Sequence, residues 1–200
     1  MSRTIVLDMD ETLVHTFDTA KSSYCDGLPS VLDFRTCMEY FSGRGYEFYI
    51  PGAGSHYGIY RPGMYHLLEK CYSLFDNVII WSAGTKGYVG EIMTKIFKDC
   101  RLPDAIFARD FCEITSQGKY HKPLRKLSYL YDGDLEETLK NTLIVDDRKD
   151  TFIENPDNGI LIPAWRGEKD DTTLFKLAAF LEATVHEDDF KMVDKKKVFK

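Results

Sequence analysis

Short apolar runs recur along the chain and predict buried strands. They span residues 4–7 (TIVL), 77–81 (NVIIW), 141–145 (NTLIV) and 159–163 (GILIP). Each run is continuously apolar and does not alternate with polar residues, which is typical of parallel strands that are covered on both faces. The pattern therefore predicts a central sheet of mainly parallel strands.

Segments with a helical spacing of apolar residues lie between and after these runs. They span residues 61–75, 87–97, 122–131 and 170–183, and the first and third carry a proline near the start. Strands that alternate with helices indicate an α/β fold, in which a central parallel sheet is flanked by helices. Ligands of such sheets bind at the carboxyl ends of the strands.

Two segments interrupt this alternation. Residues 17–60 are rich in aromatic residues and glycine, and the stretch CMEYFSGRGYEFYI (37–50) predicts a β-hairpin around SGRG. We expect this segment to form a flap over the mouth of the site. Residues 99–118 predict a small strand-rich insertion. Neither segment is large enough for a second domain, so residues 1–200 are expected to form a single domain.

Acidic and hydroxyl side chains follow three of the predicted strands. Asp8 and Asp10 follow the first, Ser82 the second, and Asp146 and Asp147 the third. Acidic turns after strands are common and need no function, but three parallel neighbours that end this way bring the groups into one crevice. Carboxylates gathered there repel one another unless a cation neutralises them. Oxygen ligands without His or Cys point to Mg²⁺.

A magnesium–carboxylate site suits phosphoryl transfer. Asp8 can attack phosphorus to give an aspartyl-phosphate, and Asp10 can protonate the leaving group as a general acid. Ser82 and Lys122, the first residue of KPLRKL, would hold the non-bridging oxygens of the phosphate. Taken alone, Ser82 also fits a capping hydroxyl, and Lys122 fits a solvated lysine at a helix start.

Composition limits the other classes of function. The formal net charge of −6 argues against a non-specific nucleic-acid surface. The sequence contains no apolar run long enough for a membrane span, and its N-terminus lacks a signal-peptide pattern. The five cysteines form no CxxC pair, so we expect reduced thiols in an intracellular protein, located in the nucleus or the cytoplasm.

The motifs together resemble one family. DMDETLVHT (8–16) resembles the DxDx(T/V) motif of the haloacid dehalogenase superfamily. More narrowly, it is similar to the start of the small phosphatases that act on the RNA polymerase II C-terminal domain, a group that includes the Dullard-type phosphatases and a mitochondrial import subunit. Later segments of that family are matched in order by YRPGMYHLLE, VIIWSAGTKGYVGEIM, GKYHKPLRKLS and TLIVDDRKDTFIENPDNGILI.

The resemblance implies a Rossmann-like haloacid dehalogenase fold with a magnesium site. The Asp8 carboxylate, the Asp10 main-chain carbonyl and the acidic pair Asp146 and Asp147 would bind the metal, and Asp147 matches the usual ligand of the pair. The chain departs from the family in having Asp–Asp in place of Asp–Asn, and in having Arg148 where a serine is usual. Its flap segment is also longer than in the small phosphatases.

The resemblance also implies an activity. Thr12, Ser82 and Lys122 would bind the substrate phosphate, and Thr12 would position Asp10 through a hydrogen bond. We expect a Mg²⁺-dependent phosphatase that hydrolyses phosphomonoesters through an aspartyl-phosphate intermediate. Its expected substrate is phosphoserine or phosphothreonine in a protein or peptide, with the RNA polymerase II C-terminal domain as one candidate. We expect a monomer without stable nucleic-acid binding.

Three alternatives stay open on the sequence. The first is a phosphatase of small molecules or nucleic-acid ends, which uses the same chemistry. The second is a phosphoacceptor of the signalling-receiver type, although Asp10 and the order of the motifs argue against it. The third is a scaffold with this fold and no turnover, although every catalytic position is occupied.

Overall fold

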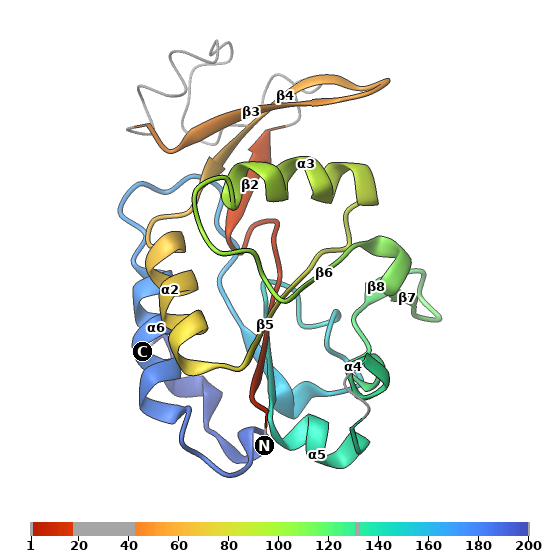
Figure 1. Ribbon diagram of the computed structural model, residues 1–200, viewed down its shortest axis with the longest axis vertical. Helices are drawn as coiled ribbons and strands as arrows, with labels where there is room; N and C mark the ends of the chain where they lie inside the picture. The colour runs from red at the N-terminus through yellow and green to blue at the C-terminus, as the bar shows by residue number, and fades with distance from the viewer. Residues whose placement is uncertain (1, 18–42, 131–132, 200) are drawn as a thin grey trace.

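The computed structural model describes residues 2–17, 43–130 and 133–199. Its centre is a five-stranded parallel sheet in the order β10-β9-β1-β5-β6 (Figure 1). The strands are β1 (Thr4–Leu7), β5 (Asn77–Trp81), β6 (Ala105–Phe107), β9 (Thr142–Asp146) and β10 (Gly159–Leu161). The predicted α/β architecture with a central parallel sheet is therefore confirmed.

The first strand of the chain lies in the middle of the sheet. Leu7 at the end of β1 lies opposite Ile80 of β5 and Val145 of β9. All residues of β1 are buried, because helices cover both faces of the sheet. This register brings the carboxyl ends of β1, β5 and β9 to one edge, where the polar residues that follow them meet.

Helices cover both faces of the sheet. They are α2 (Met64–Leu74), α3 (Lys86–Ile96), α4 (Arg125–Leu130), α5 (Leu135–Lys140) and α6 (Thr173–Thr184). Short 3-10 helices span Arg109–Phe111, Pro156–Asn158, Phe190–Met192 and Lys195–Lys197. Side chains of β1 alternate between the faces: Ile5 and Leu7 join a cluster with α2, α3 and α6, whereas Val6 packs with Leu127 of α4.

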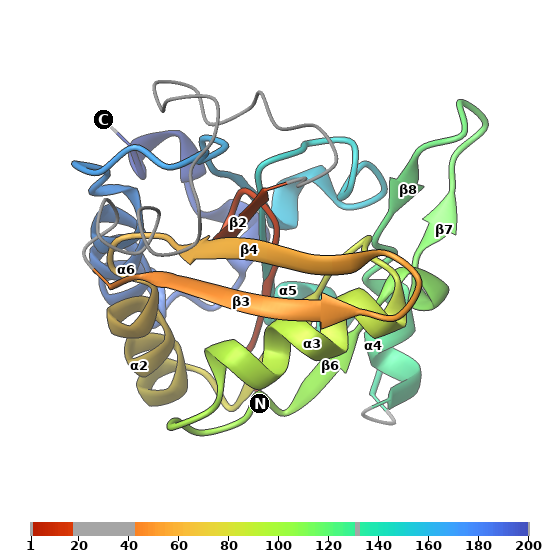
Figure 2. The ribbon, with the colours of Figure 1, turned by 90° about the horizontal axis from the view of Figure 1, so that it is seen from above.

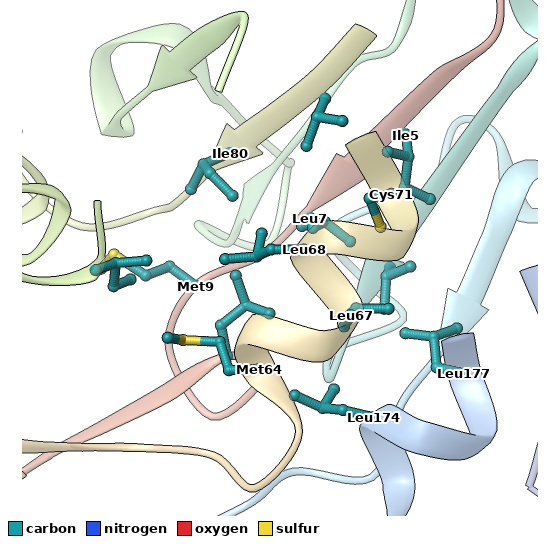
Figure 3. Packing of buried hydrophobic residues seen from close by; sticks show 14 of the residues in the cluster. Ile5, Leu7, Met9, Met64, Leu67, Leu68, Cys71, Ile80, Leu174 and Leu177 are labelled. Carbon is teal, nitrogen blue, oxygen red and sulfur yellow. The ribbon is translucent and has the colours of Figure 1, made fainter. Parts of the chain in front are cut away.

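The larger cluster shows why these helices form. The apolar stripe of α2 (Met64, Leu67, Leu68 and Cys71) is buried, and it packs with Leu7 and Ile80 of the sheet and with Leu174 and Leu177 of α6 (Figure 3). Burial of each such side chain stabilises the fold by roughly 1.5–3 kcal/mol. The helical spacing read from the sequence is thus the spacing that faces the core.

Two elements were missed or misplaced by the sequence pattern. Ala105–Phe107 lies in the predicted insertion 99–118, yet it forms β6, the edge strand of the central sheet. Its three residues are only partly buried, which explains why no strong apolar run marks it. Helix α5 was also not predicted, although Asp134 caps it by accepting a hydrogen bond from Glu137 N at 3.0 Å.

The flap is an antiparallel sheet of three strands in the order β2-β4-β3. They are β2 (Val14–Phe17), β3 (Gly45–Ile50) and β4 (Gly54–Tyr60). The β3–β4 hairpin lies across the carboxyl edge of the central sheet and above α3 (Figures 1 and 2). It turns at residues 51–53. The hairpin predicted around SGRG (42–45) stays a prediction, because residues 37–42 lie outside the described part of the chain.

A second, smaller hairpin lies apart from the central sheet. Strands β7 (Glu113–Ile114) and β8 (Tyr120–His121) pair antiparallel and project from the body of the molecule (Figure 2). Strand β7 lies within the predicted insertion 99–118, whereas β8 falls just after it. Within the described residues, no helix combines the length and the apolar character that crossing a bilayer needs.

Candidate active site

The structure brings most of the predicted site residues together at the carboxyl edge of the sheet. Asp8 and Ser82 directly follow β1 and β5, Asp146 ends β9, and Asp147 comes next. Lys122 directly follows β8 and reaches the same point. Four separate segments therefore supply one small group of polar side chains.

Lys122 lies at the centre of this group. Its Nζ atom is 2.6 Å from Asp8 Oδ1 and 2.5 Å from Asp146 Oδ2, and the lysine is only 1% exposed. Burial disfavours the charge of Lys122, but the charges of Asp146 and Asp8 outweigh burial and raise its pKa. Asp146 Oδ1 in turn accepts a hydrogen bond from Arg148 N at 2.9 Å. Both oxygens of Asp146 are therefore engaged.

Negative charge exceeds positive charge at this point. Burial raises the pKa of Asp8 well above its ordinary value, Asp146 raises it further, and Lys122 offsets only part of the effect. Burial and the charge of Asp146 also raise the pKa of Asp147 to about 6. Carboxylates in this state gain from a bound cation, because the cation removes their mutual repulsion.

The donor set fits Mg²⁺. Oxygens of Asp8, Asp146 and Asp147 lie within 4.8 Å of one another, and no His or Cys belongs to this cluster among the described residues. The Asp147 carboxylate has no hydrogen-bond or ion-pair partner among the residues that the structure describes, in contrast to Asp146. Hard oxygen ligands of this kind are those that Mg²⁺ prefers.

Asp10 lies in a different environment from Asp8. Its Oδ1 atom accepts a hydrogen bond from the Tyr88 hydroxyl, and its Oδ2 atom accepts one from Ser82 Oγ at 3.2 Å. Burial raises the pKa of Asp10 to about 6, although the hydrogen bond from Tyr88 opposes the shift. Asp8 thus contacts a cation and Asp10 contacts hydroxyl groups.

The expected hydrogen bond between Thr12 and Asp10 is absent. Thr12 Oγ1 is buried and has no hydrogen-bond partner among the described residues. Tyr88, in the first turn of α3, contacts Asp10 in its place. Sequence reasoning missed Tyr88, because a tyrosine near the start of an amphipathic helix looks like an ordinary packing residue.

A buried arginine, also missed, fixes the loop after β1. Arg61 is 1% exposed and donates to the carbonyl oxygens of Glu11 and Thr12 at 3.3 and 3.2 Å. It also forms two hydrogen bonds of 3.0 Å to Asp171. Glu11 itself has a positive φ of 56°, which is uncommon for a residue other than glycine. The loop therefore depends on contacts from residues far along the chain.

Another cation lies next to the loop that follows Ser82. Arg109 is exposed, its Nε donates to Ala83 O at 2.8 Å, and its main-chain N donates to Gly84 O at 2.9 Å. Its guanidinium also lies 5.1 Å from the centre of the Tyr120 ring. No role was predicted for Arg109, because nothing in the strand pattern placed it near the crevice.

Comparison with known families agrees with this geometry. Residues 3–191 match the family model described as NLI interacting factor-like phosphatase. The matched region includes every predicted site residue. It also extends over the five strands of the central sheet and the flap.

Curated relatives are more distant. The chain is 27% identical over 187 residues to CTD small phosphatase-like protein 2 of Dictyostelium discoideum, in a match that covers 94% of this chain but 28% of that protein. It is 29% identical over 181 residues to CTD small phosphatase-like protein 3 of Caenorhabditis elegans, and that match covers 90% of this chain and 53% of the relative. The chain thus spans between about a quarter and about half of the length of these relatives.

A human relative and a solved structure extend the comparison. Carboxy-terminal domain RNA polymerase II polypeptide A small phosphatase 2 of Homo sapiens is 26% identical over 179 residues, covering 89% of this chain and 55% of that protein. The structure of the fission yeast RNA polymerase II CTD phosphatase Fcp1 has a TM-score of 0.58 and 22% identity, covering 82% of this chain and 42% of the other. At that identity the likeness supports the fold alone.

Proposed function

This chain belongs to the NLI interacting factor-like phosphatase family of the haloacid dehalogenase superfamily, and we propose that it hydrolyses phosphoserine or phosphothreonine in proteins. The observation that carries the proposal is the contrast between two aspartates separated by one residue. Asp8 contacts the Lys122 cation, and Asp10 is held by two hydroxyl groups. Environments that separate two carboxyl groups in this way separate a nucleophile from a proton carrier.

Each of the site residues then has its own role in the reaction. Asp8 attacks phosphorus and forms the aspartyl-phosphate, while the bond from phosphorus to the leaving oxygen breaks. Asp10 gives its proton to the leaving oxygen, and afterwards takes a proton from the water that hydrolyses the intermediate. Lys122 and Ser82 hold the non-bridging oxygens, and Thr12, whose buried hydroxyl lacks a partner among the described residues, completes this group.

Mg²⁺ would be held by the Asp8 carboxylate, the Asp10 main-chain carbonyl and Asp147. When bound, it neutralises the carboxylates and the phosphate oxygens. Asp146 fits a supporting role better than a direct one, because both of its oxygens already accept hydrogen bonds. This assignment favours Asp147 over Asp146 as the direct ligand of the acidic pair.

The proposed substrate class rests on two observations. Apart from the three-stranded flap, the small hairpin of β7 and β8 is the only strand-rich insertion in the described part of the chain, and a crevice without a large cap suits an extended peptide. The human relative is named for a protein substrate, the RNA polymerase II C-terminal domain. We therefore propose a protein substrate for this chain as well. We also propose that the chain is a single domain and a monomer, and that it acts in the cytoplasm or the nucleus.

The flap contributes less to substrate recognition than its aromatic composition indicates. Tyr46 and Phe48 are buried against the body of the molecule, whereas Tyr49 is 59% exposed. Tyr40 and Phe41 lie outside the described residues. Of the three aromatic residues that the structure describes on β3, Tyr49 is therefore the one available to a peptide.

Hydrolysis of p-nitrophenyl phosphate at mildly acidic pH, with Mg²⁺ or with EDTA, tests the proposed chemistry. We expect metal-dependent release by the wild type and none by Asp8→Asn, because a carboxamide is not a nucleophile. Folded, Mg²⁺-loaded wild type without turnover would favour a scaffold role. A panel of phosphopeptides and phosphorylated metabolites would then test the substrate class, and preference for metabolites would contradict the protein-phosphatase proposal.

A further inference from the structure

We infer that Tyr88 is a positioning residue that fixes which oxygen of Asp10 faces the phosphate-binding group. The inference rests on the proposed function, since it assigns Asp10 the role of proton carrier. It follows from the hydrogen bonds around Asp10 and from the packing of the Tyr88 ring. No other tyrosine hydroxyl hydrogen-bonds to Asp10 in the described part of the chain.

Two hydroxyl groups contact the Asp10 carboxylate, and a third contacts one of them. The Tyr88 hydroxyl donates to Asp10 Oδ1, and its oxygen lies 3.0 Å from Thr16 Oγ1 on β2. On the other side, Ser82 Oγ lies 3.2 Å from Asp10 Oδ2 and accepts a hydrogen bond from Gly84 N at 2.9 Å. Each oxygen of Asp10 therefore has its own hydroxyl partner.

The two oxygens of Asp10 have different neighbours. Oδ1 is held by the Tyr88 hydroxyl, which also contacts Thr16 on β2. With Oδ1 held there, Oδ2 lies next to Ser82, which belongs to the proposed phosphate-binding group. Tyr88 thus keeps the Asp10 carboxyl group turned with one oxygen towards the phosphate-binding group.

Packing keeps the Tyr88 ring in the required place. A Cβ atom at Gly84 would lie 2.7 Å from Tyr88 Cδ1, so the ring occupies space that any larger residue at position 84 would take. On the flap side, the rings of Phe48 and Tyr88 meet edge to face with centroids 5.9 Å apart. The ring is therefore held between the loop after Ser82 and the flap, and Tyr88→Phe preserves both contacts.

The proton goes to the leaving oxygen as its bond to phosphorus breaks, so the defect of Tyr88→Phe depends on the leaving group. Esters of acidic phenols depart with little help, whereas esters of weak acids need the proton. We expect kcat/KM of Tyr88→Phe to fall about tenfold on phenyl phosphate, a fraction of the full contribution of a general acid. On p-nitrophenyl phosphate the loss should be below about threefold.

The experiment measures kcat/KM for a series of aryl phosphates with wild type, Tyr88→Phe, Asp10→Asn and Tyr72→Phe, all with Mg²⁺. Tyr72→Phe is the matched control, because it removes a tyrosine hydroxyl that donates to Arg101 O at 2.9 Å, away from Asp10. It should leave every rate unchanged. Asp10→Asn should show the same dependence on the leaving group as Tyr88→Phe, but a steeper one.

The outcomes separate the inference from the proposed function. An equal loss on all esters in folded Tyr88→Phe, or no loss, would overturn the positioning role while the phosphatase function stands. Wild type that hydrolyses no ester in the series would overturn the proposed function, and the inference with it. A graded loss in Tyr88→Phe that parallels Asp10→Asn would support the role of Tyr88.

Discussion

Two clusters in this molecule each place one cation between two carboxylates, but they differ in burial. Lys122 lies between Asp8 and Asp146 with contacts of 2.6 and 2.5 Å, and Arg125 lies between Glu113 and Glu154 with contacts of 2.5 and 2.6 Å. The Lys122 side chain is 1% exposed, whereas that of Arg125 is 38% exposed. The contact distances alone do not distinguish the clusters.

Charge balance and solvent distinguish them. We call the exposed cluster around Arg125 the outer cluster and the buried cluster around Lys122 the inner cluster. Lys126 adds a second cation to the outer cluster, 3.3 Å from Glu113, so two glutamates face two cations there. Buried His121 lies 3.7 Å from Glu154 and completes a possible set of metal ligands, but the neutral charge balance removes the need for an ion. In the inner cluster, Asp147 adds negative charge without a matching cation. Uncompensated charge in a buried place therefore marks the functional cluster.

The largest expected difference between the clusters is in turnover. Asp8→Asn should abolish phosphatase activity, because it removes the nucleophile and leaves the shape of the site nearly unchanged. Glu113→Gln, the matched change in the outer cluster, should keep activity within about twofold, since surface pairs contribute little. Steady-state assays on p-nitrophenyl phosphate measure both variants. Residual turnover in Asp8→Asn would argue that another residue attacks phosphorus.

Removing the central cation should separate the clusters in stability. Lys122→Met leaves two buried carboxylates without their partner and should lower the free energy of unfolding of the metal-free protein by roughly 3–5 kcal/mol. Arg125→Met should cost less than about 1 kcal/mol, and high salt should remove that cost. Urea denaturation with EDTA measures both values. Similar losses in the two variants would show that burial does not set the difference.

Metal binding offers a finer test of the same comparison. Asp147→Asn should weaken Mg²⁺ binding by at least about tenfold. Loss of a residue that only supports a metal ligand already costs about tenfold in affinity, and loss of a direct ligand should cost no less. Glu154→Gln should leave Mg²⁺ affinity unchanged, because its cluster is already neutral. Isothermal titration calorimetry provides the affinities. If Asp147→Asn binds Mg²⁺ as the wild type does, Asp146 would become the better candidate for the direct ligand.

The smallest expected effect is a pH dependence of opposite sign in the two clusters. The pKa values of Asp10 and Asp147 are raised to about 6 in the folded state, so these groups destabilise the metal-free protein as pH rises from about 4 to above 6. Arg125 lowers the pKa of Glu113, whose contribution is instead lost as pH falls towards that lowered pKa. Solvent screens the contribution of Glu113 to the free energy of unfolding, so we expect that contribution to be minor.

Thermal unfolding between pH 4.5 and 7.5 in EDTA measures this dependence. We expect the melting temperature to fall by a few degrees as pH rises through the window, and Mg²⁺ to restore it at pH 7.5. The Asp10→Asn, Asp147→Asn double variant should reduce the decline, and the remainder falls to Asp8, whose pKa burial also raises. A decline of the same size in the double variant would assign it to other groups.

The sequence was most informative where burial on both faces constrains it. The continuous runs at residues 4–7 and 77–81 coincide with β1 and β5, because every position there is apolar or lies at a strand end. Asp8, Ser82 and Asp146 could be expected to converge, since parallel strands end at one edge. Lys122 was placed from chemistry and resemblance, because its own segment shows no sheet pattern.

Features that depend on contacts between distant segments were harder to predict. The three residues of β6 acquire their place by pairing with β5 and show no strong periodicity of their own. Arg61 and Asp171 are separated by 110 positions, so neither residue indicates the other locally. Tyr88 was missed for the same reason, since only the fold brings α3 next to Asp10.

The Arg61–Asp171 pair also has a consequence for synthesis of the protein. Arg61 holds the loop that follows the nucleophile, and Asp171 anchors Arg61 from a segment that is made much later. A nascent chain contains all of the site aspartates before that anchor has left the ribosome. We therefore expect catalytic competence to arise late in translation, after most of the sheet has been synthesised, so that an unfinished chain carries the reactive groups without their working geometry.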